Sequence, residues 1–288
     1  MATPIRSTRS SRCISQIITK ANTSFGRLSF QFSAACDWNE LQKSLKLETF
    51  ISLTNFKHLL SEQLTDRCIN IKNLMQIDAG LGQVVATDTS QIPYYLVGDE
   101  WIRLPGSLKH ITVGPAGIWG VNKDYAIYKY VAGNWVQAAG LLKQLDAGGE
   151  QFIVGANMDD TPFCLTRSAT VGYKGPGSPL PWTGLPGAVK YYSCGPFGCW
   201  AVNKNDDIFL MNCQNNGWSH IGGKLSMIEV ATDGSVFGVN SAGQVYTSKP
   251  EGTGWSNIPM CMHMGHVTYD LGRLWVVSKS GVTMVCTP

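Results

Sequence analysis

Residues 106–140, GSLKHITVGPAGIWGVNKDYAIYKYVAGNWVQAAG, contain four short strand-like segments joined by turn residues. The segments are 109–113, 118–121, 126–130 and the one that begins at Trp135, and Gly, Pro, Asn and Asp separate them. β-branched and aromatic residues favour strands, whereas Gly, Pro, Asn and Asp favour tight turns. This stretch therefore predicts one antiparallel sheet of four strands.

The same pattern recurs through residues 68–288 at intervals of about 36 residues, apart from one longer interval that contains a Gly- and Pro-rich insertion at 169–181. Four-stranded units repeated around an axis define a β-propeller, and this length accommodates six of them. We therefore predict an all-β fold, a six-bladed β-propeller spanning residues 68–288. The tryptophans that mark the repeat are Trp101, Trp135, Trp182, Trp218 and Trp255. A second marker recurs as Gly120-Val-Asn122, Gly155-Ala-Asn157, Ala201-Val-Asn203 and Gly238-Val-Asn240.

The two ends of the repeat complement each other. The last unit supplies only three strands, near 266–269, 274–277 and 282–286, while residues 68–75 align with the outermost strand of a unit. We predict that this N-terminal strand completes the last blade, which leaves no open sheet edge. It would place Cys68 beside Cys286, and we predict a disulfide between them, worth at most about 4–5 kcal/mol in the loop-entropy account.

The chain has 9 cysteines, which favours an oxidising compartment, with buried thiols as the alternative. Cys194 and Cys199 flank the turn Gly195-Pro-Phe-Gly198 between two expected strands, so a second disulfide is predicted there. The sequence leaves the partners of three others undecided, and these are Cys164, Cys213 and Cys261.

Residues 1–67 differ from the repeat and are expected to form a separate leader or extension, partly disordered with a short helix. The first 36 residues carry Arg, Lys, Ser and Thr with no Asp or Glu, a composition closer to a mitochondrial transit peptide than to a secretory signal. Residues 38–66 place Leu and Phe loosely at helical spacing. A targeting extension and a start site that replaces a secretory leader both remain open.

Composition and motifs exclude several classes of function. A net charge of +3 with scattered Lys and Arg gives no basic patch for nucleic acid, and no apolar run is long enough to predict membrane insertion. Nucleophile-elbow, zinc-protease, phosphate-loop and dinucleotide motifs are missing from the sequence. We therefore expect no enzyme activity, no cofactor and no metal site, although sequence spacing cannot show whether carboxylates such as Asp146 and Glu229 meet in the fold.

The repeat resembles the tectonin repeat, and residues 68–288 resemble the fish-egg lectins. The stretches that carry this resemblance are 74–80, 106–117, 140–149, 190–196 and 227–240. The resemblance implies a secreted, disulfide-bonded propeller lectin of innate defence that binds N-acetylglucosamine-type glycans on microbial or egg surfaces. Residues 1–67 depart from that family pattern.

Sugar recognition needs an aromatic face and a few fixed polar groups. The residues in the repeat that offer these groups are Trp119, Asn122, Asp124, Asn157, Asp159, Trp200, Asn203, Asp206 and Asn240. Each Asn or Asp has the alternative role of stabilising its own turn, and the five repeat tryptophans have the alternative role of packing between blades. Several weak sites would act together through avidity. A protein-interaction scaffold built on the same propeller is the alternative function, and a homo-oligomer remains open.

Overall fold

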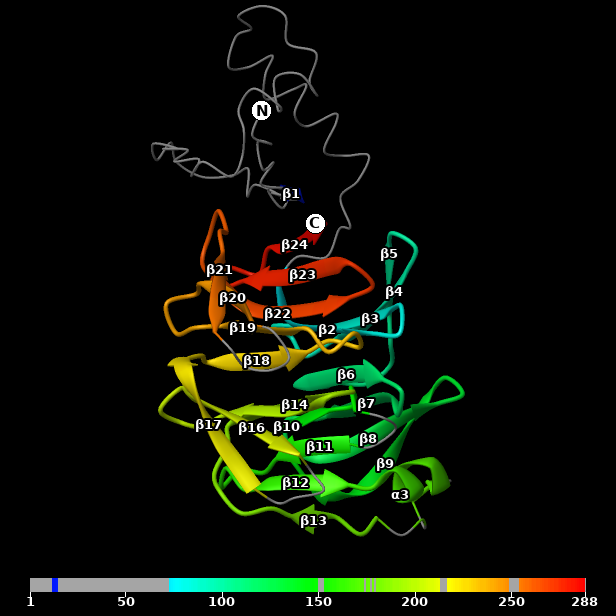
Figure 1. The fold of residues 1–288 in the computed structure, drawn as a ribbon. Coiled ribbons are helices and arrows are strands. Elements are labelled where there is room, and N and C mark those ends of the chain that lie inside the picture. The colour runs from blue at the N-terminus through cyan, green and yellow to red at the C-terminus, as the bar shows by residue number, and fades with distance from the viewer. Residues whose placement is uncertain are drawn as a thin grey trace, which may run out of the picture.

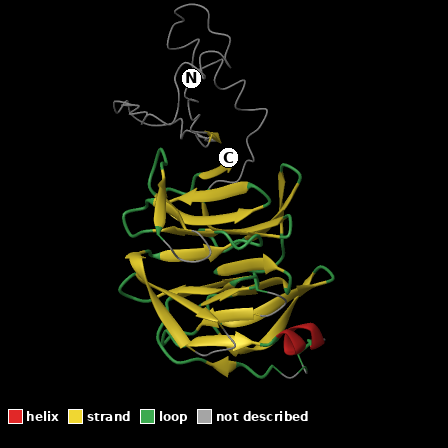
Figure 2. Cartoon of the chain, in the orientation of Figure 1, coloured by secondary structure: helices red, strands yellow, loops and turns green. Residues whose placement is uncertain are grey.

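A computed structural model describes residues 12–14, 73–149, 153–173, 175, 176, 178, 180–212, 217–248 and 254–287. These residues form six four-stranded sheets in which every pair of neighbouring strands is antiparallel. Figure 2 shows that strands and loops make up almost all of the described chain. The prediction of an all-β, six-bladed propeller is confirmed.

Each blade begins with its innermost strand, and these strands contact one another in a closed ring that returns from the sixth blade to the first. Figure 1 labels these strands. The innermost strands are β2 (Leu74–Gly80), β6 (His110–Gly114), β10 (Gln144–Asp146), β14 (Tyr191–Gly195), β18 (Met227–Val230) and β22 (Met264–Asp270). The second strands are β3 (Gln83–Asp88), β7 (Gly117–Val121), β11 (Ile153–Ala156), β15 (Gly198–Val202), β19 (Val236–Val239) and β23 (Arg273–Ser278).

The third and fourth strands of each blade lie progressively further from the axis. The third strands are β4 (Pro93–Val97), β8 (Ala126–Val131), β12 (Pro162–Leu165), β16 (Asp207–Asn212), β20 (Val245–Ser248) and β24 (Thr283–Thr287). The outermost strands are β5 (Glu100–Arg103), β9 (Asn134–Leu141), β13 (Thr183–Gly184), β17 (Gly217–Lys224), β21 (Trp255–Ile258) and, for the sixth blade, β1 (Arg12–Ile14).

The insertion predicted at residues 169–181 lies in the third blade, between β12 and β13. The short helix α3 (Arg167–Gly172) begins just before the insertion and ends within it. The next residue is Tyr173, and the centre of its ring lies 5.6 Å from that of Trp119 in the second blade. Tyr173 therefore covers part of the boundary between these two blades. Within the part of the chain that the structure describes, no helix is long and apolar enough to cross a membrane.

In the sixth blade β1 pairs with β24 as the fourth strand of the sheet, and closure of the ring by an N-terminal strand stays a prediction. Cys13 lies opposite Cys286 in the β1–β24 pair. The predicted closing strand around Cys68, its disulfide with Cys286 and the helix predicted within 38–66 all lie outside the described residues, so they stay predictions.

Buried apolar side chains form six clusters, one between each pair of neighbouring blades. The cluster between the first and second blades, for example, brings Val85 and Leu104 against Ile111 and Val113. Sheets that are apolar on both faces cannot be stable alone, so packing between blades supplies the stability of the ring.

The outer tryptophans join neighbouring blades through the glycine of the repeat. The indole Nε1 of Trp182 donates a hydrogen bond to the carbonyl oxygen of Ala139 at 2.8 Å, directly beside Gly140. Gly140 has φ +110°, and a Cβ placed there would lie 2.8 Å from Trp182 Nε1. The same arrangement recurs at Trp135 with Pro105, Trp218 with Pro186 and Trp255 with Gly222. These tryptophans therefore pack between neighbouring blades, which is the alternative role that the sequence analysis gave them.

Replacing Gly140 with alanine is expected to lower the free energy of unfolding by about 2–4 kcal/mol, because a new Cβ overlaps Trp182 and is strained at positive φ. Urea unfolding measures this loss. The matched control is Gly133→Ala, which has φ +86° but no heavy atom within 4 Å of the new Cβ, so it loses only about 1 kcal/mol. Equal losses at both positions would contradict the role given to Trp182.

Candidate functional site

Six polar side chains, one from the innermost strand of each blade, surround the propeller axis. We call them the axial ring. Carboxylic acids come from the first, third and fifth blades, and hydroxyls come from the second, fourth and sixth. In blade order the ring is Asp78, Thr112, Asp146, Ser193, Glu229 and Thr268, all buried.

Five members of the axial ring accept a hydrogen bond from a backbone N–H of the next blade. Asp146 Oδ2, for example, accepts the N–H of Cys194 at 2.6 Å. The other four acceptors are Asp78 for Val113, Thr112 for Ala147, Ser193 for Val230 and Thr268 for Ala79. The hydrogen bonds between strands stay within one blade, so the axial ring adds hydrogen bonds that join neighbouring blades. These bonds also hold the side chains of the ring in a fixed orientation.

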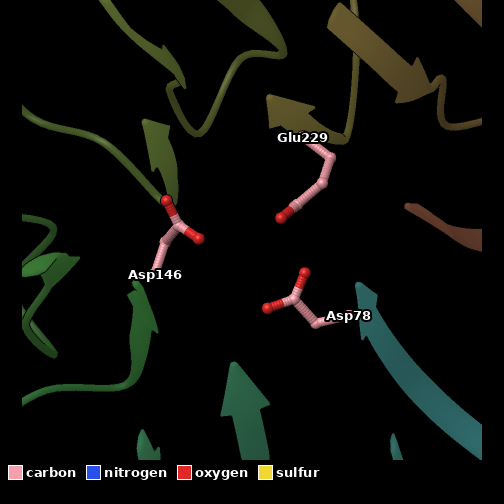
Figure 3. A group of neighbouring side chains, drawn as sticks. All are labelled: Asp78, Asp146 and Glu229. Atoms are coloured by element: carbon pink, nitrogen blue, oxygen red, sulfur yellow. The ribbon is translucent and has the colours of Figure 1, made fainter. Parts of the chain in front are cut away.

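The three carboxyl groups of the axial ring converge. One carboxylate oxygen from each of Asp78, Asp146 and Glu229 lies within 4.8 Å of the other two, and Figure 3 shows the side chains pointing toward one another. Burial raises the pKa of all three, and the neighbouring Asp78 carboxylate adds to the effect at Asp146, whose pKa rises to about 7. Three negative charges at this separation are unstable without protons or a counter-charge.

The converging oxygens can hold protons or a hard cation. Oxygen-only donor sets with several carboxylates suit divalent cations such as Ca²⁺. Asp78, Asp146 and Glu229 are the residues that would supply those oxygens, and their pKa values would then fall.

A second layer of side chains lies next to the axial ring. The hydroxyl of Tyr191 lies 3.3 Å from Glu229 Oε2, to which it donates, 2.9 Å from His266 Nε2 and 3.4 Å from His110 Nε2. Burial lowers the pKa of both histidines to about 3, so both imidazoles are neutral at neutral pH. Gln76 and Gln144 each bond both the N–H and the carbonyl of one residue in the following blade.

Sequence reasoning did not identify the axial ring. Asp146 and Glu229 were considered together, but their separation in sequence gives no indication of contact. One signal was available, because Gln76-Ile-Asp78 and Gln144-Leu-Asp146 repeat the same spacing just before a glycine-containing turn. Acids at one repeat position in alternate blades must converge once that position faces the axis.

The two tryptophans proposed to bind sugar lie inside the protein. Trp119 is 0% exposed, and its Nε1 donates to the carbonyl oxygen of Ala116 at 2.9 Å. The ammonium group of Lys129 lies 5.2 Å from the centre of the Trp119 ring. Trp200 is 2% exposed and meets Trp255 edge to face, with ring centres 6.0 Å apart. Neither ring presents a face to solvent.

The four candidate asparagines stabilise the turn between the second and third strands of their own blades. Asn157 Oδ1, for example, accepts the backbone N–H groups of Asp159 at 3.0 Å and Thr161 at 2.8 Å. Asn122, Asn203 and Asn240 accept backbone N–H groups in the same way. The structure places these residues one per blade at the same end of the strands, without gathering them into one pocket.

The candidate carboxylates lie in the same turns. Asp124 and Asp159 are exposed at the turn tips, whereas Asp206 forms an ion pair with Lys190. Asp160, next to Asp159, pairs with Lys143 in the equivalent position of the third blade. Polar groups that can bond sugar hydroxyls are therefore present on this face.

An aromatic ring that the sequence analysis did not propose is exposed at the opposite ends of the strands. Phe197 is 71% exposed, in the turn between β14 and β15. Cys194 and Cys199, which lie opposite each other at the base of this turn, form the predicted disulfide. The ring rests against Gly234 of the next blade, where a Cβ would overlap it. The disulfide and this contact hold an exposed aromatic face in place.

The fold and these sites define a β-propeller protein with a buried acidic centre and polar turns. The tectonin domain family model matches residues 73–279, so the chain belongs to the tectonin family. It is 49% identical over 228 residues to the fish-egg lectin of Cyprinus carpio, an alignment that covers 74% of this chain and 95% of that protein.

Solved structures of distant propellers share the fold. Virginiamycin B lyase from Staphylococcus aureus has a TM-score of 0.53 at 10% identity, covering 75% of this chain and 95% of that one. The WD40 β-propeller domain of Doa1 has a TM-score of 0.51 at 12% identity, covering 75% and 93%. At these identities the likeness concerns the fold alone.

Proposed function

We propose that this protein is a lectin that binds N-acetylglucosamine-type glycans on microbial or egg surfaces and acts in innate defence by binding rather than by catalysis. The carp relative, which is a fish-egg lectin and aligns over almost its whole length, supports carbohydrate binding in general. The structural observation that carries the proposal is the exposed ring of Phe197, fixed by a disulfide beside a polar turn.

The sugar site proposed here lies between the fourth and fifth blades. Phe197 offers an apolar face on which the hydrophobic side of a sugar ring can stack. The adjacent turn of the fifth blade contains Thr232, the exposed Asp233 and Ser235, whose N–H donates to Asp233 Oδ1 at 2.8 Å. These groups can bond sugar hydroxyls, and the absence of a side chain at Gly234 leaves room for Phe197.

The turns at the other ends of the strands provide further, weaker contacts. Asn122 with Asp124, Asn157 with Asp159, Asn203 with Asp206, and Asn240 remain proposed ligands for hydroxyl groups. Trp119 and Trp200 would support these turns from inside the blades. Weak sites repeated around a ring increase avidity for a dense glycan surface by 10²–10⁴-fold without any single strong site.

An extracellular location is part of the proposal. Disulfides persist in oxidising compartments, and the Cys194–Cys199 disulfide fits this setting. The relationship to a fish-egg lectin supports the same location.

The alternative function is a protein-interaction scaffold. Leu81, Phe197 and Leu271, at the first turns of three blades, are all more than half exposed, and exposed apolar side chains also suit protein partners. Retention on immobilised sugar separates the two functions, because a scaffold that does not bind sugar is not eluted specifically by free N-acetylglucosamine.

Phe197→Ala is expected to weaken binding to N-acetylglucosamine about fivefold, since a stacked aromatic contact is worth on the order of 1 kcal/mol. The full chain, folded under oxidising conditions, is applied to N-acetylglucosamine beads and eluted with the free sugar. Leu271→Ala is the matched control, because this side chain is 75% exposed in the first turn of another blade.

Two results would count against the proposal. If folded wild-type protein is not retained, or is not eluted by the free sugar, the lectin assignment fails and the scaffold is preferred. If wild type and both variants bind equally, the protein is a lectin but its site is not at Phe197.

A further inference from the structure

The linker between the fifth and sixth blades consists of residue types that bind soft metal ions. Residues 259–263 connect β21 to β22, and the sequence from Met260 to Met264 reads Met-Cys-Met-His-Met. Thioethers, a thiol and an imidazole are soft or borderline ligands, and this linker contains no carboxylate. Thioether ligands are absent from the zinc-protease and phosphate-loop motifs considered above.

The repeat does not account for this composition. In four other linkers a buried aliphatic residue lies four positions before the axial ring and follows the blade tryptophan by seven residues, and these residues are Leu108, Leu142, Val189 and Leu225. Met264 has the same role and is 0% exposed, but it follows Trp255 by nine residues. The linker is therefore two residues longer than its equivalents. Because Met264 fills the core position, Met260, Met262 and His263 are available for another role.

The sulfur atoms of this linker lie beside a buried methionine of β24. Met260 and Met262 pack against the apolar cluster between the fifth and sixth blades, to which Met284 belongs. Cys261 Sγ lies 3.9 Å from Met284 Sδ. Two sulfur ligands of one metal ion, each with a bond of about 2.3 Å, are about 3.8 Å apart in a tetrahedral site. The contact therefore places the Met284 thioether as close to the linker as a shared metal ion requires.

The linker is held in place at its C-terminal end and is open to solvent. The backbone carbonyl oxygen of His263 accepts the N–H of Lys279 at 3.0 Å. Cys261 and His263 are exposed, whereas Met284 is 1% exposed. An ion can thus reach the linker from solvent, while the Met284 ligand stays in the apolar cluster.

We propose that the linker and Met284 form a binding site for Cu(I). Its ligands are the thioethers of Met260, Met262 and Met284 and the imidazole of His263. Soft thioether ligands select Cu(I), whereas Zn²⁺ prefers thiolate, imidazole and carboxylate ligands and Ca²⁺ prefers oxygen ligands. Cys261 locates Met284 beside the linker, and the site does not require it as a ligand, whatever its own partner is.

A thioether site suits an oxidising compartment. Thiolate ligands are lost when cysteines form disulfides, as Cys194 and Cys199 do, whereas methionine thioethers do not form disulfides. The proposed ligands therefore stay available where this disulfide persists. The site does not involve Phe197, so the inference does not depend on the sugar ligand of the propeller.

The methyl signals of the methionines test the assignment. The full chain is labelled with ¹³C at the methionine methyl groups, folded under oxidising conditions and titrated with Cu(I) under argon, and NMR spectra are recorded. We expect the signals of Met260, Met262 and Met284 to shift and to saturate at one equivalent. The signal of Met158, which is 41% exposed in a turn of the third blade, should stay unchanged.

Leucine variants provide a second measurement, because an exchange of Met for Leu conserves volume and preserves the fold. Met262→Leu and Met284→Leu should each weaken Cu(I) binding by about tenfold or more in competition with bicinchoninate, whereas Met158→Leu should leave it unchanged. Cys261→Ser should keep the methyl shifts. The proposal is overturned if any of the three ligand signals stays unchanged, if the Met158 signal shifts with them, or if Cys261→Ser abolishes the shifts. Binding of equal strength in Met284→Leu and Met158→Leu would overturn it as well.

Discussion

Replacing Trp119 with alanine is expected to lower the free energy of unfolding by about 3–5 kcal/mol, the range found for deleting large buried aromatic side chains. The side chain is 0% exposed and packs in the cluster between the second and third blades, against Leu145 and Ile153. Truncation leaves a cavity there and removes both the hydrogen bond to Ala116 and the ring beneath Lys129. Urea unfolding followed by circular dichroism measures the loss.

Trp135→Ala is the matched control, because this tryptophan also donates through Nε1, to Pro105, but is only partly buried. It should lose distinctly less stability than Trp119→Ala. Trp119→Phe, which keeps most of the buried volume, should recover most of the loss and bind N-acetylglucosamine like wild type. A variant at Trp119 with normal stability and lost sugar binding would instead make this residue a direct ligand contact.

The propeller could be predicted from the repeat because each recurring residue has a structural role within its own blade or against the next one. Gly140 and its equivalents provide positive φ and the room for a tryptophan of the next blade, so these residues recur with the blade. In the second blade the expected strands at 109–113, 118–121 and 126–130 match β6, β7 and β8 to within a few residues. The Gly, Pro, Asn and Asp residues of the turns determine where each of these strands begins and ends.

The candidate site was predicted less well, because a repeat does not tell which face of a strand meets solvent. Trp119 and Trp200 occupy equivalent places in β7 and β15 and share one role, which is packing between blades. The exposed Phe197 lies in a turn that the sequence analysis used only to predict a disulfide. The axial ring depends on contacts between residues as far apart as Asp78 and Thr268, which local patterns cannot show.

The stability of the cation-free protein is expected to fall as pH rises from about 4 to about 7, and Asp146 is a main cause. Burial and the Asp78 carboxylate raise its pKa from 3.8 to about 7 in the folded protein. Between these pKa values the folded state holds a proton that the unfolded state has lost. The stabilisation is therefore complete below pH 4 and disappears toward pH 7, by up to about 1.4 kcal/mol per pH unit.

Asp146→Asn tests this directly, because the amide can still accept the N–H of Cys194 but carries no titrating proton. Urea unfolding is measured at pH 4, 5, 6 and 7 in EDTA, so that no cation neutralises the three carboxylates. The difference in stability between variant and wild type should shift in favour of the variant by a few kcal/mol across this range, since the amide avoids a buried negative charge at pH 7. Asp159→Asn, which removes an exposed carboxylate outside the axial ring, is the control variant. A difference for Asp146→Asn that does not vary with pH would mean that this carboxyl group is not protonated in the folded protein at pH 4–7, and the strong repulsion described for the axial ring would then be absent.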